Sequence, residues 1–175
     1  MYQFCYTLSE HEYFEFNIHH AFNSPTSKKN MLFYHFVPPF IFVICGLFLG
    51  TIVEEPVTSC YFYVAFGIVA ILWFTFYKWI MIKIIKKNIK RFKKSGYKLP
   101  YENSVIISFE DEYFVETTEK GDSRTKYSAI ELVVSAEKAI YIYINAVQAI
   151  ILPFTVFSDE QKRNDFLVFI EGKMA

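Results

Sequence analysis

Three side chains that can bind a metal ion recur every four residues near the N-terminus: His11, Glu15 and His19. On a helix this spacing lines them along one face, and imidazoles with a carboxylate are ligands that zinc accepts. The segment contains no HExxH motif, however, and positions that span two helical turns rarely reach one ion together. We therefore interpret these residues as the polar border of an apolar helical stripe, and we expect neither a metal ion nor a cofactor.

Other residue types with chemical potential lack the spacing that catalysis needs. The sequence contains no GxSxG, P-loop, GxGxxG or paired-acid signature. Cys5, Cys45 and Cys60 have no CxxC spacing and fit a reducing compartment better than a disulfide framework. His35 lies only four residues inside an apolar run, where we expect a neutral imidazole at a membrane interface. The sequence therefore predicts a protein that is not an enzyme.

Charged residues are distributed unevenly along a chain whose formal net charge is zero. Nine of the 18 Lys and Arg residues fall between Lys78 and Lys98, a window without Asp or Glu. From Tyr101 onward the chain carries 13 acidic and 7 basic residues. A basic segment beside an apolar run is typical of the membrane surface. The acidic C-terminal part argues against binding to nucleic acid.

Two long runs, Met31–Val53 and Pro56–Tyr77, contain no Asp, Glu, Lys or Arg. About 20 helical residues suffice to cross the apolar core of a bilayer. A soluble domain of this size could hardly bury two such helices on all sides. The sequence therefore predicts a transmembrane hairpin with spans at about 31–53 and 57–79, within a region that extends over 31–98.

The residues that flank the spans predict the orientation of the hairpin. Lys28 and Lys29 precede the first span and a cluster of basic residues follows the second, whereas the connection carries only Glu54 and Glu55. Lys and Arg remain preferentially in the cytoplasm. We therefore expect a multi-pass membrane protein with both termini in the cytoplasm.

Two features of the first span leave alternatives open. Pro38–Pro39 either starts the regular helix, with residues 31–37 at the interface, or kinks a longer helix. Gly46 and Gly50 form a GxxxG motif, which lets helices approach closely. The motif can serve packing inside the hairpin or contact with a second copy in a homodimer.

The helical pattern continues beyond the second span, with apolar residues on one face, lysines on the other, and a stop at Ser95–Gly96. The membrane-surface candidates are Lys83, Lys86, Lys87, Lys90, Arg91, Lys93 and Lys94. They either bind anionic lipids or act only as an orientation signal with lysines that reach toward water.

The C-terminal part, residues 99–175, alternates as β structure does. Val105, Ile107 and Phe109 share one face of a strand, and Tyr113 and Val115 belong to the next. Further strands are predicted at Thr125–Tyr127, Ile130–Ser135, Ala139–Ile144 and Val147–Leu152, with a turn at Glu119–Asp122. The short, evenly spaced strands indicate an antiparallel meander. A capping box at Ser158–Gln161 then starts a last helix. Six strands closed by one C-terminal helix describe a PH-like (pleckstrin-homology-like) β domain.

The N-terminal segment, residues 1–30, is predicted to pack with that domain. Tyr2, Phe4 and Tyr6 alternate with polar residues as in a strand, and Ser9 with Glu12 forms a capping box for a helix. A lone strand cannot satisfy its backbone groups, so we expect it to join the C-terminal sheet. The predicted fold class is an α+β membrane protein.

Two stretches resemble the YcxB-like family of bacterial membrane proteins. They are KYSAIELVVSAEKAIYIYINAVQAIILPFTVFSDEQKRNDFLVFI, particularly IILPFTVF, and the opening YTLSEHEYFEFNIHH. The resemblance implies the order strand–helix, hairpin, basic linker and β domain, and it supplies no catalytic residues. It also implies that the protein lies in the bacterial cytoplasmic (inner) membrane. Some members carry an aromatic residue near the position of Tyr127, which we interpret as a packing residue.

Two functions are compatible with these features. The first is a non-enzymatic, membrane-anchored binding or regulatory module that recognises an unidentified protein partner, for instance by strand addition. The second is an immunity protein whose hairpin engages a membrane-active toxin or bacteriocin.

Overall fold

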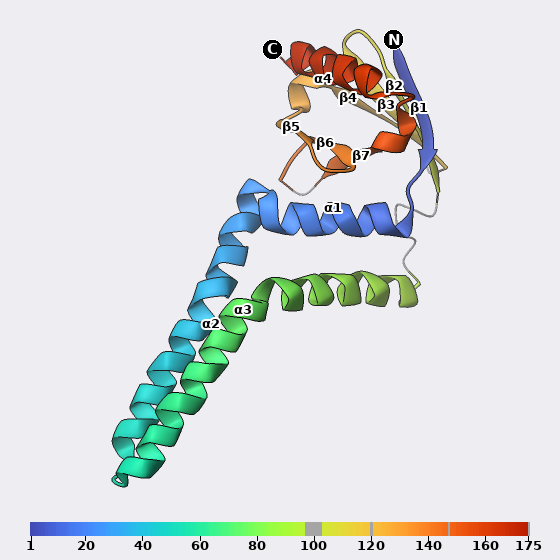
Figure 1. Cartoon of the computed structure of the whole chain (residues 1–175). Helices are drawn as coiled ribbons and strands as arrows, with labels where there is room; N and C mark the ends of the chain where they lie inside the picture. Colours follow the sequence, from blue (N-terminus) through green and yellow to red (C-terminus); the bar gives the residue numbers. More distant parts are fainter. Residues whose placement is uncertain (97–102, 120, 147, 175) are drawn as a thin grey trace. The chain divides into compact units, whose positions relative to one another are not determined.

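The computed structural model describes residues 1–96, 103–119, 121–146 and 148–174. Its elements are, in chain order, β1 (Tyr2–Thr7), α1 (Glu10–Asn23), α2 (Pro25–Ile52), α3 (Pro56–Lys94), β2 (Ser104–Phe109), β3 (Tyr113–Thr118), β4 (Gly121–Lys126), the 3₁₀ turn η2 (Tyr127–Ala129), β5 (Leu132–Ser135), β6 (Ala139–Tyr143), β7 (Ala149–Pro153), the 3₁₀ turn η3 (Phe154–Val156) and α4 (Glu160–Met174) (Figure 1).

These elements form two compact units. The β unit comprises Met1–Asn17 and Phe92–Ala175, and the hairpin unit comprises Ile18–Arg91. The predicted N-terminal segment 1–30 is therefore divided between the units, because α1 passes from one to the other. The predicted boundary between residues 98 and 99 lies outside the described residues.

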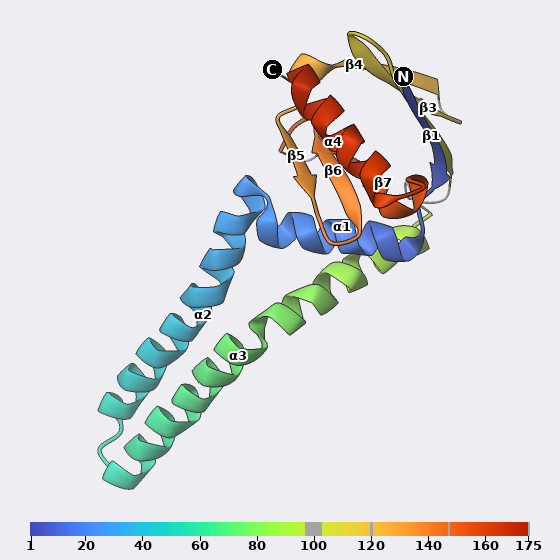
Figure 2. The same cartoon turned by 45° about the horizontal axis from the view of Figure 1, so that its top comes forward.

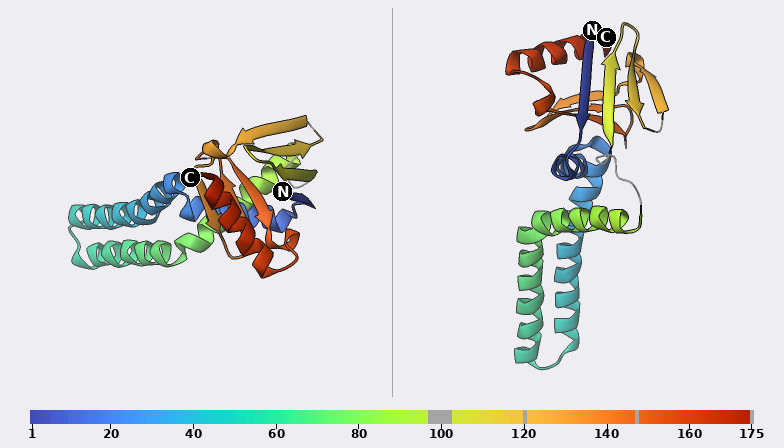
Figure 3. Two further views of the ribbon diagram at one scale, coloured as in Figure 1. Left: turned by 90° about the horizontal axis from the view of Figure 1, so that it is seen from above. Right: turned by 90° about the vertical axis from the view of Figure 1, so that its right-hand side faces the viewer.

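Strand β1 is part of the sheet that the C-terminal half of the chain builds. It pairs antiparallel with β2 along its whole length, with Phe4 opposite Ile107 (Figure 3). Phe4 is 8% exposed, and its ring lies edge-on to the rings of Phe109 and Phe166. Burying a ring of this size favours docking of the strand. The prediction that the N-terminal strand joins the C-terminal sheet is confirmed.

The strands form two antiparallel sheets, β1-β2-β3-β4 and β5-β6-β7, in place of one continuous meander. The break follows β4, which ends at Lys126 because Tyr127 turns inward in η2. The hydroxyl of Tyr127 donates to the carbonyl of Glu110 at 2.6 Å, and its side chain is 3% exposed. The predicted strand at Thr125–Tyr127 is therefore wrong in its bounds, and Lys120 of the predicted turn lies outside the described residues. The interpretation of Tyr127 as a packing residue is confirmed.

Side chains from both sheets and from α4 make one core, and Figure 2 shows α4 lying across the strands β5, β6 and β7. Phe166 and Ile170 of α4 have no exposed surface and contact this core. In β3 the buried residue is Phe114, at 1% exposure, whereas Tyr113 and Val115, which the sequence singled out, are half-buried. The alternation of buried and exposed residues could not be recognised in the sequence, because Tyr113 and Phe114 are adjacent aromatic residues and each face of the strand therefore carries an apolar side chain.

The last helix begins one residue later than the predicted capping box requires. The carboxylate of Asp159 accepts the backbone N–H of Lys162 at 2.8 Å, while the Ser158 hydroxyl donates to that same carboxylate. Asp159 is thus the N-cap, and the assignment to Ser158 is wrong. A carboxylate near a helix N-terminus also interacts favourably with the helix dipole. At α1 the predicted capping box is confirmed, since Ser9 and Glu12 each bond the other's backbone N–H.

Helix α2 is continuous from Pro25 to Ile52 and contains Pro38 and Pro39 in its interior. The alternative in which the regular helix begins at Pro38 is therefore wrong. A proline lacks the N–H that would bond the carbonyl four residues earlier, which for Pro38 is that of Tyr34. The indole Nε1 of Trp73, in α3, donates to this carbonyl at 3.2 Å. The second helix thus supplies the hydrogen bond that the proline removes from the first.

Helices α2 and α3 lie side by side (Figures 1 and 2), and the GxxxG motif is at their contact. A methyl group added to Gly46 would come within 2.7 Å of Cβ of Phe66, and one added to Gly50 would overlap the ring of Tyr63. Only glycine permits this approach. In this structure the motif serves packing inside the hairpin, which was one of the two predicted alternatives.

Candidate functional site

The seven basic candidates lie on the C-terminal third of α3, which continues to Lys94 as predicted. We call Lys83, Lys86, Lys87, Lys90, Arg91, Lys93 and Lys94 the basic segment. All are exposed except Lys86, which is half-buried. Ile89, on the apolar face of the same turns, is buried. Gly96 follows with φ +80°, a backbone conformation that glycine adopts easily and that ends the helix.

The members of the basic segment differ in their surroundings. The ammonium of Lys83 lies 3.6 Å from the ring centroid of Trp79. The ammonium of Lys93 lies 3.6 Å from the carboxylate of Glu10, with both side chains close to half exposed. Exposed pairs of this kind contribute little stability. The segment is therefore a largely exposed cationic surface, in which Lys93 has a close carboxylate partner in Glu10.

A groove that the sequence did not predict is lined by residues of β1 and β7 in the β unit. Within the described residues each of these strands has a strand neighbour on one side only. The cavity between them has a volume of about 220 Å³. We call it the edge groove, and its lining residues are Tyr6, Leu8, Tyr13, Phe16, Val105, Glu116, Gln148, Ala149, Ile150 and Ile151.

Glu116 is the acidic side chain in this mostly apolar lining. Burial raises the pKa of the Glu116 carboxyl. Burial also raises the pKa of the Tyr6 hydroxyl, and the negative charges of Glu116 and Glu12 raise it further. Across the part of the chain that the structure describes, no Lys or Arg forms an ion pair with Glu116. The groove therefore offers apolar surface with one carboxyl that a cation from outside would stabilise in its charged form.

The position of Glu116 in the groove was not predicted, because a single charged residue in a strand usually faces water. One partial signal was available, since Glu116 lies two residues after Phe114 and so on the same face of β3, although the adjacent Tyr113 left open which face is inward. The partners that complete the groove, from β7 and α1, are far away in the sequence and gave no such signal.

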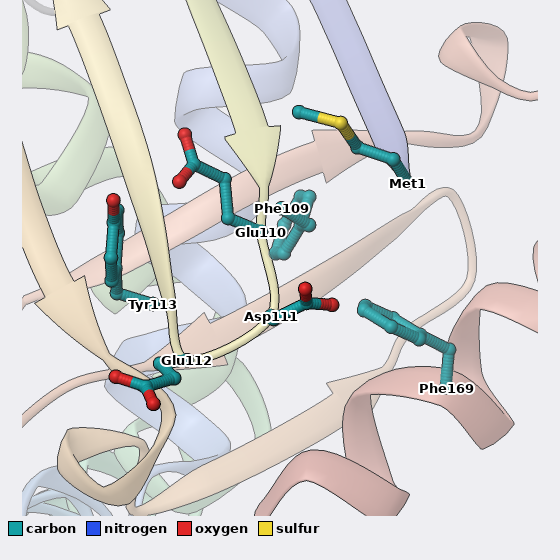
Figure 4. Close-up of a pocket in the computed structure, with 7 residues that line it drawn as sticks. All are labelled: Met1, Phe109, Glu110, Asp111, Glu112, Tyr113 and Phe169. Atoms are coloured by element: carbon teal, nitrogen blue, oxygen red, sulfur yellow. The ribbon is translucent and has the colours of Figure 1, made fainter.

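A second cavity, of about 650 Å³, lies beside the turn between β2 and β3 (Figure 4). Three consecutive acidic residues, Glu110, Asp111 and Glu112, line it together with Phe109 and Phe169. Figure 4 shows that the three carboxylates point in different directions, so they do not converge on one position. A side chain of α4 fixes this turn through its backbone, because the ammonium of Lys173 donates a hydrogen bond to the carbonyl of Asp111 at 2.7 Å.

The histidines of α1 do not assemble a recognisable metal site. Nε2 of His11 lies 3.7 Å from the carboxylate of Glu15; the His11 side chain is mostly exposed, and that of Glu15 is partly exposed. Burial lowers the pKa values of His19 and His20. Within the described ranges no three His, Cys, Asp or Glu side chains are arranged to hold a metal ion. His35, in α2, stacks on the ring of Tyr77 with a centroid separation of 4.6 Å.

Comparison with protein families gives a match for one part of the chain. Residues 109–170 match the model of the family described as YcxB-like protein. Comparison with curated proteins gives no match, and comparison with solved structures gives none either. The matched range runs from the end of β2 into α4 and includes Glu116 and the β7 side of the edge groove. The resemblance of the C-terminal stretch is thereby confirmed, while that of the opening segment stays a prediction. Between Phe109 and Ile170 this chain therefore carries the sequence pattern of the YcxB-like family.

Proposed function

We propose that this chain is a non-enzymatic, membrane-anchored binding module of the bacterial cytoplasmic membrane. Its hairpin crosses the bilayer, both chain ends lie at the cytoplasmic face, and the β unit binds an extended segment of a partner protein there. The bacterial setting rests on the resemblance to the YcxB-like family.

The observation that carries the proposal is the uncovered apolar surface of α2 and α3. Each helix is long and apolar enough to cross a membrane, and only 6% of its most apolar 18-residue window is buried. Large apolar side chains such as Phe40, Phe48 and Ile71 are exposed. Leaving such surface in water is costly, at roughly 25 cal/mol for each Å². A bilayer would cover this surface, whereas the helices of a soluble core are covered by protein.

Two features support the orientation. The connection between the helices carries Glu54 and Glu55, whereas Lys28, Lys29 and the basic segment flank the other ends of the apolar stretches. In addition, β1 precedes the hairpin and β2 follows it, and these strands pair. Both chain ends must then lie on one side of the membrane, as an even number of spans requires.

The arrangement of the β unit supports a PH-like architecture. Sheets of four and three antiparallel strands are followed by one C-terminal helix. In this interpretation β1 is the first strand of the domain, and the hairpin is inserted between the first and second strands. The basic segment then leads back from the membrane, and its exposed lysines attract anionic lipids.

The edge groove is the place where we propose that a partner segment binds. Its apolar lining suits apolar side chains of an extended segment, and the outer edges of β1 and β7 can pair with a strand. Glu116 selects for a Lys or Arg in that segment. The acidic excess after Tyr101 favours the approach of such a partner.

Site-specific crosslinking in native membranes tests this function. A photo-reactive amino acid is placed at Gln148, at the groove, or at Ser128, which is exposed outside it. We expect a discrete adduct from position 148 alone, which disappears when Glu116→Lys is added and persists with the matched control Glu131→Lys. Adducts that form equally from both positions, or that ignore Glu116→Lys, would exclude the groove as the binding site.

A further inference from the structure

The hairpin unit contains a small cavity with two lysines in its lining. Its volume is about 210 Å³, and besides His35 it is lined by Lys28, Lys78, Phe22, Met31, Leu32 and Tyr77. We call it the lysine pocket. Lys28 and Lys78 are exposed, while the other four side chains present apolar or aromatic surface. Among the described residues that line the pocket, none is acidic.

The floor of the lysine pocket is fixed by contacts between α2 and α3. The hydroxyl of Tyr77 donates to the carbonyl of Met31 at 2.5 Å, and Tyr77 is 4% exposed. His35, which also lines the pocket, stacks on Tyr77 and Phe74. The pocket is therefore a formed feature of the hairpin, with both helices contributing to it.

Each helix contributes one of the two lysines. Lys28 lies in the first turn of α2, before the apolar stretch begins, and Lys78 directly follows Tyr77. The ammonium of Lys78 lies 5.9 Å from the ring centroid of Phe22, which lines the same pocket. Two exposed lysines beside an apolar lining match a molecule with an anionic head and an apolar body.

We infer that the lysine pocket binds the phosphate end of an anionic phospholipid. The inference rests on the proposed function, because it requires that the hairpin lies in a bilayer. The two lysines bracket the phosphate, and the acyl chains continue over exposed apolar side chains such as Leu32 and Phe36. Free inorganic phosphate would gain from the lysines but not from this apolar surface, so the occupant is a lipid.

This site differs from the basic segment, to which neither lysine belongs. A solvated cationic surface attracts anionic lipids without fixing one of them. The pocket instead predicts a preference that depends on two specific lysines. The neighbouring residue Lys29 is exposed, carries the same charge and does not line the pocket, so it provides a matched control.

Fluorescence quenching of the full chain in bilayers measures this preference. The two tryptophans, Trp73 and Trp79, are both in the hairpin unit and report on nearby acyl chains. The protein is reconstituted in mixtures of phosphatidylcholine and phosphatidylglycerol in which one lipid carries brominated chains. The relative association of the two lipids follows from the quenching at each composition.

We expect the unchanged protein to prefer phosphatidylglycerol. Lys28→Gln and Lys78→Gln should each lower this preference about fivefold, the effect of about one lysine near a lipid headgroup. Lys29→Gln should leave it nearly unchanged, and Lys28→Arg should retain it. Equal losses in Lys28→Gln and Lys29→Gln, or no preference in the unchanged protein, would overturn the lysine pocket as a lipid site. No quenching by either brominated lipid would instead overturn the membrane anchor itself.

Discussion

The hydrogen bond from Trp73 to Tyr34 shows how single residues keep the hairpin regular. Pro38 leaves the carbonyl of Tyr34 without its donor inside α2, and Trp73 reaches it from 39 positions along the chain. A carbonyl without a partner in an apolar environment is costly. The tolerance of α2 for its prolines therefore depends on α3.

This dependence predicts a coupling between Trp73 and Pro38. Trp73→Phe should destabilise the unchanged hairpin more than a Pro38→Ala hairpin, because alanine restores the N–H that bonds Tyr34. We expect a coupling energy of about 0.5–1.5 kcal/mol, the range for hydrogen bonds within membranes. Unfolding of the four proteins in detergent micelles measures it. If Trp73→Phe costs the same in both backgrounds, the indole does not compensate for the proline.

The N-cap of α4 gives a second prediction at this scale, and it depends on pH. The backbone hydrogen bond from Lys162 and the hydroxyl of Ser158 hold the pKa of Asp159 below its ordinary value. A lowered pKa in the folded state stabilises the protein above the pKa of the unfolded state, and this contribution disappears as the pH falls through the folded value. Asp159→Ala should therefore lower the melting temperature by a few degrees at pH 7 and much less at the most acidic pH at which the protein stays folded.

Ser158→Ala is the control for the cap, because it removes the residue that the sequence pattern indicated while leaving the carboxylate in place. Thermal unfolding of both variants across pH distinguishes the two assignments. A larger loss for Ser158→Ala at pH 7 would contradict Asp159 as the cap.

At the scale of elements, the docking of β1 makes the β unit depend on both ends of the chain. Phe4→Ala should lower the free energy of unfolding by about 3–5 kcal/mol, the usual cost of removing a buried phenyl ring. Gln3→Ala, at an exposed position of the same strand, should change it by less than about 0.5 kcal/mol. Amide hydrogen exchange of the full chain should show lost protection in β2 after Phe4→Ala. Unchanged protection of Ile107 would mean that β2 is stable without β1.

The glycines of the hairpin predict opposite effects of the same substitution. Gly46→Ala should destabilise the hairpin by about 1 kcal/mol or more, since Cβ of Phe66 cannot move away without its backbone. Gly67, in α3, has no described atom within 4 Å of an added methyl group, so Gly67→Ala should stabilise by up to about 1 kcal/mol through helix propensity. Thermal unfolding in detergent compares them. Stabilisation by both substitutions would show that the helices do not approach closely at Gly46.

Sequence patterns predicted elements better than they predicted the contacts between distant elements. The alternation from Tyr2 to Leu8 sufficed to place β1 in a sheet, because its apolar face needs cover. In contrast, Tyr113 and Phe114 are adjacent aromatic residues, so periodicity could not decide which one faces the core. The role of Trp73 and the burial of Glu116 were not predictable, because each depends on a backbone or strand from elsewhere in the chain.

At the scale of the whole molecule, the central claim is that the hairpin crosses the membrane and returns both chain ends to the cytoplasmic face. The uncovered apolar surface of α2 and α3 and the acidic connection between them support it. The groove and the lysine pocket acquire their proposed roles only in this setting.

Cysteine labelling in intact cells tests this claim most directly. Single cysteines are introduced by Glu54→Cys or Lys94→Cys after Cys5, Cys45 and Cys60 have been replaced by serine. We expect a membrane-impermeant maleimide to label position 54 in intact cells, and position 94 only after the membrane is permeabilised. Labelling of position 94 from outside intact cells, with position 54 protected until permeabilisation, would contradict the proposed orientation.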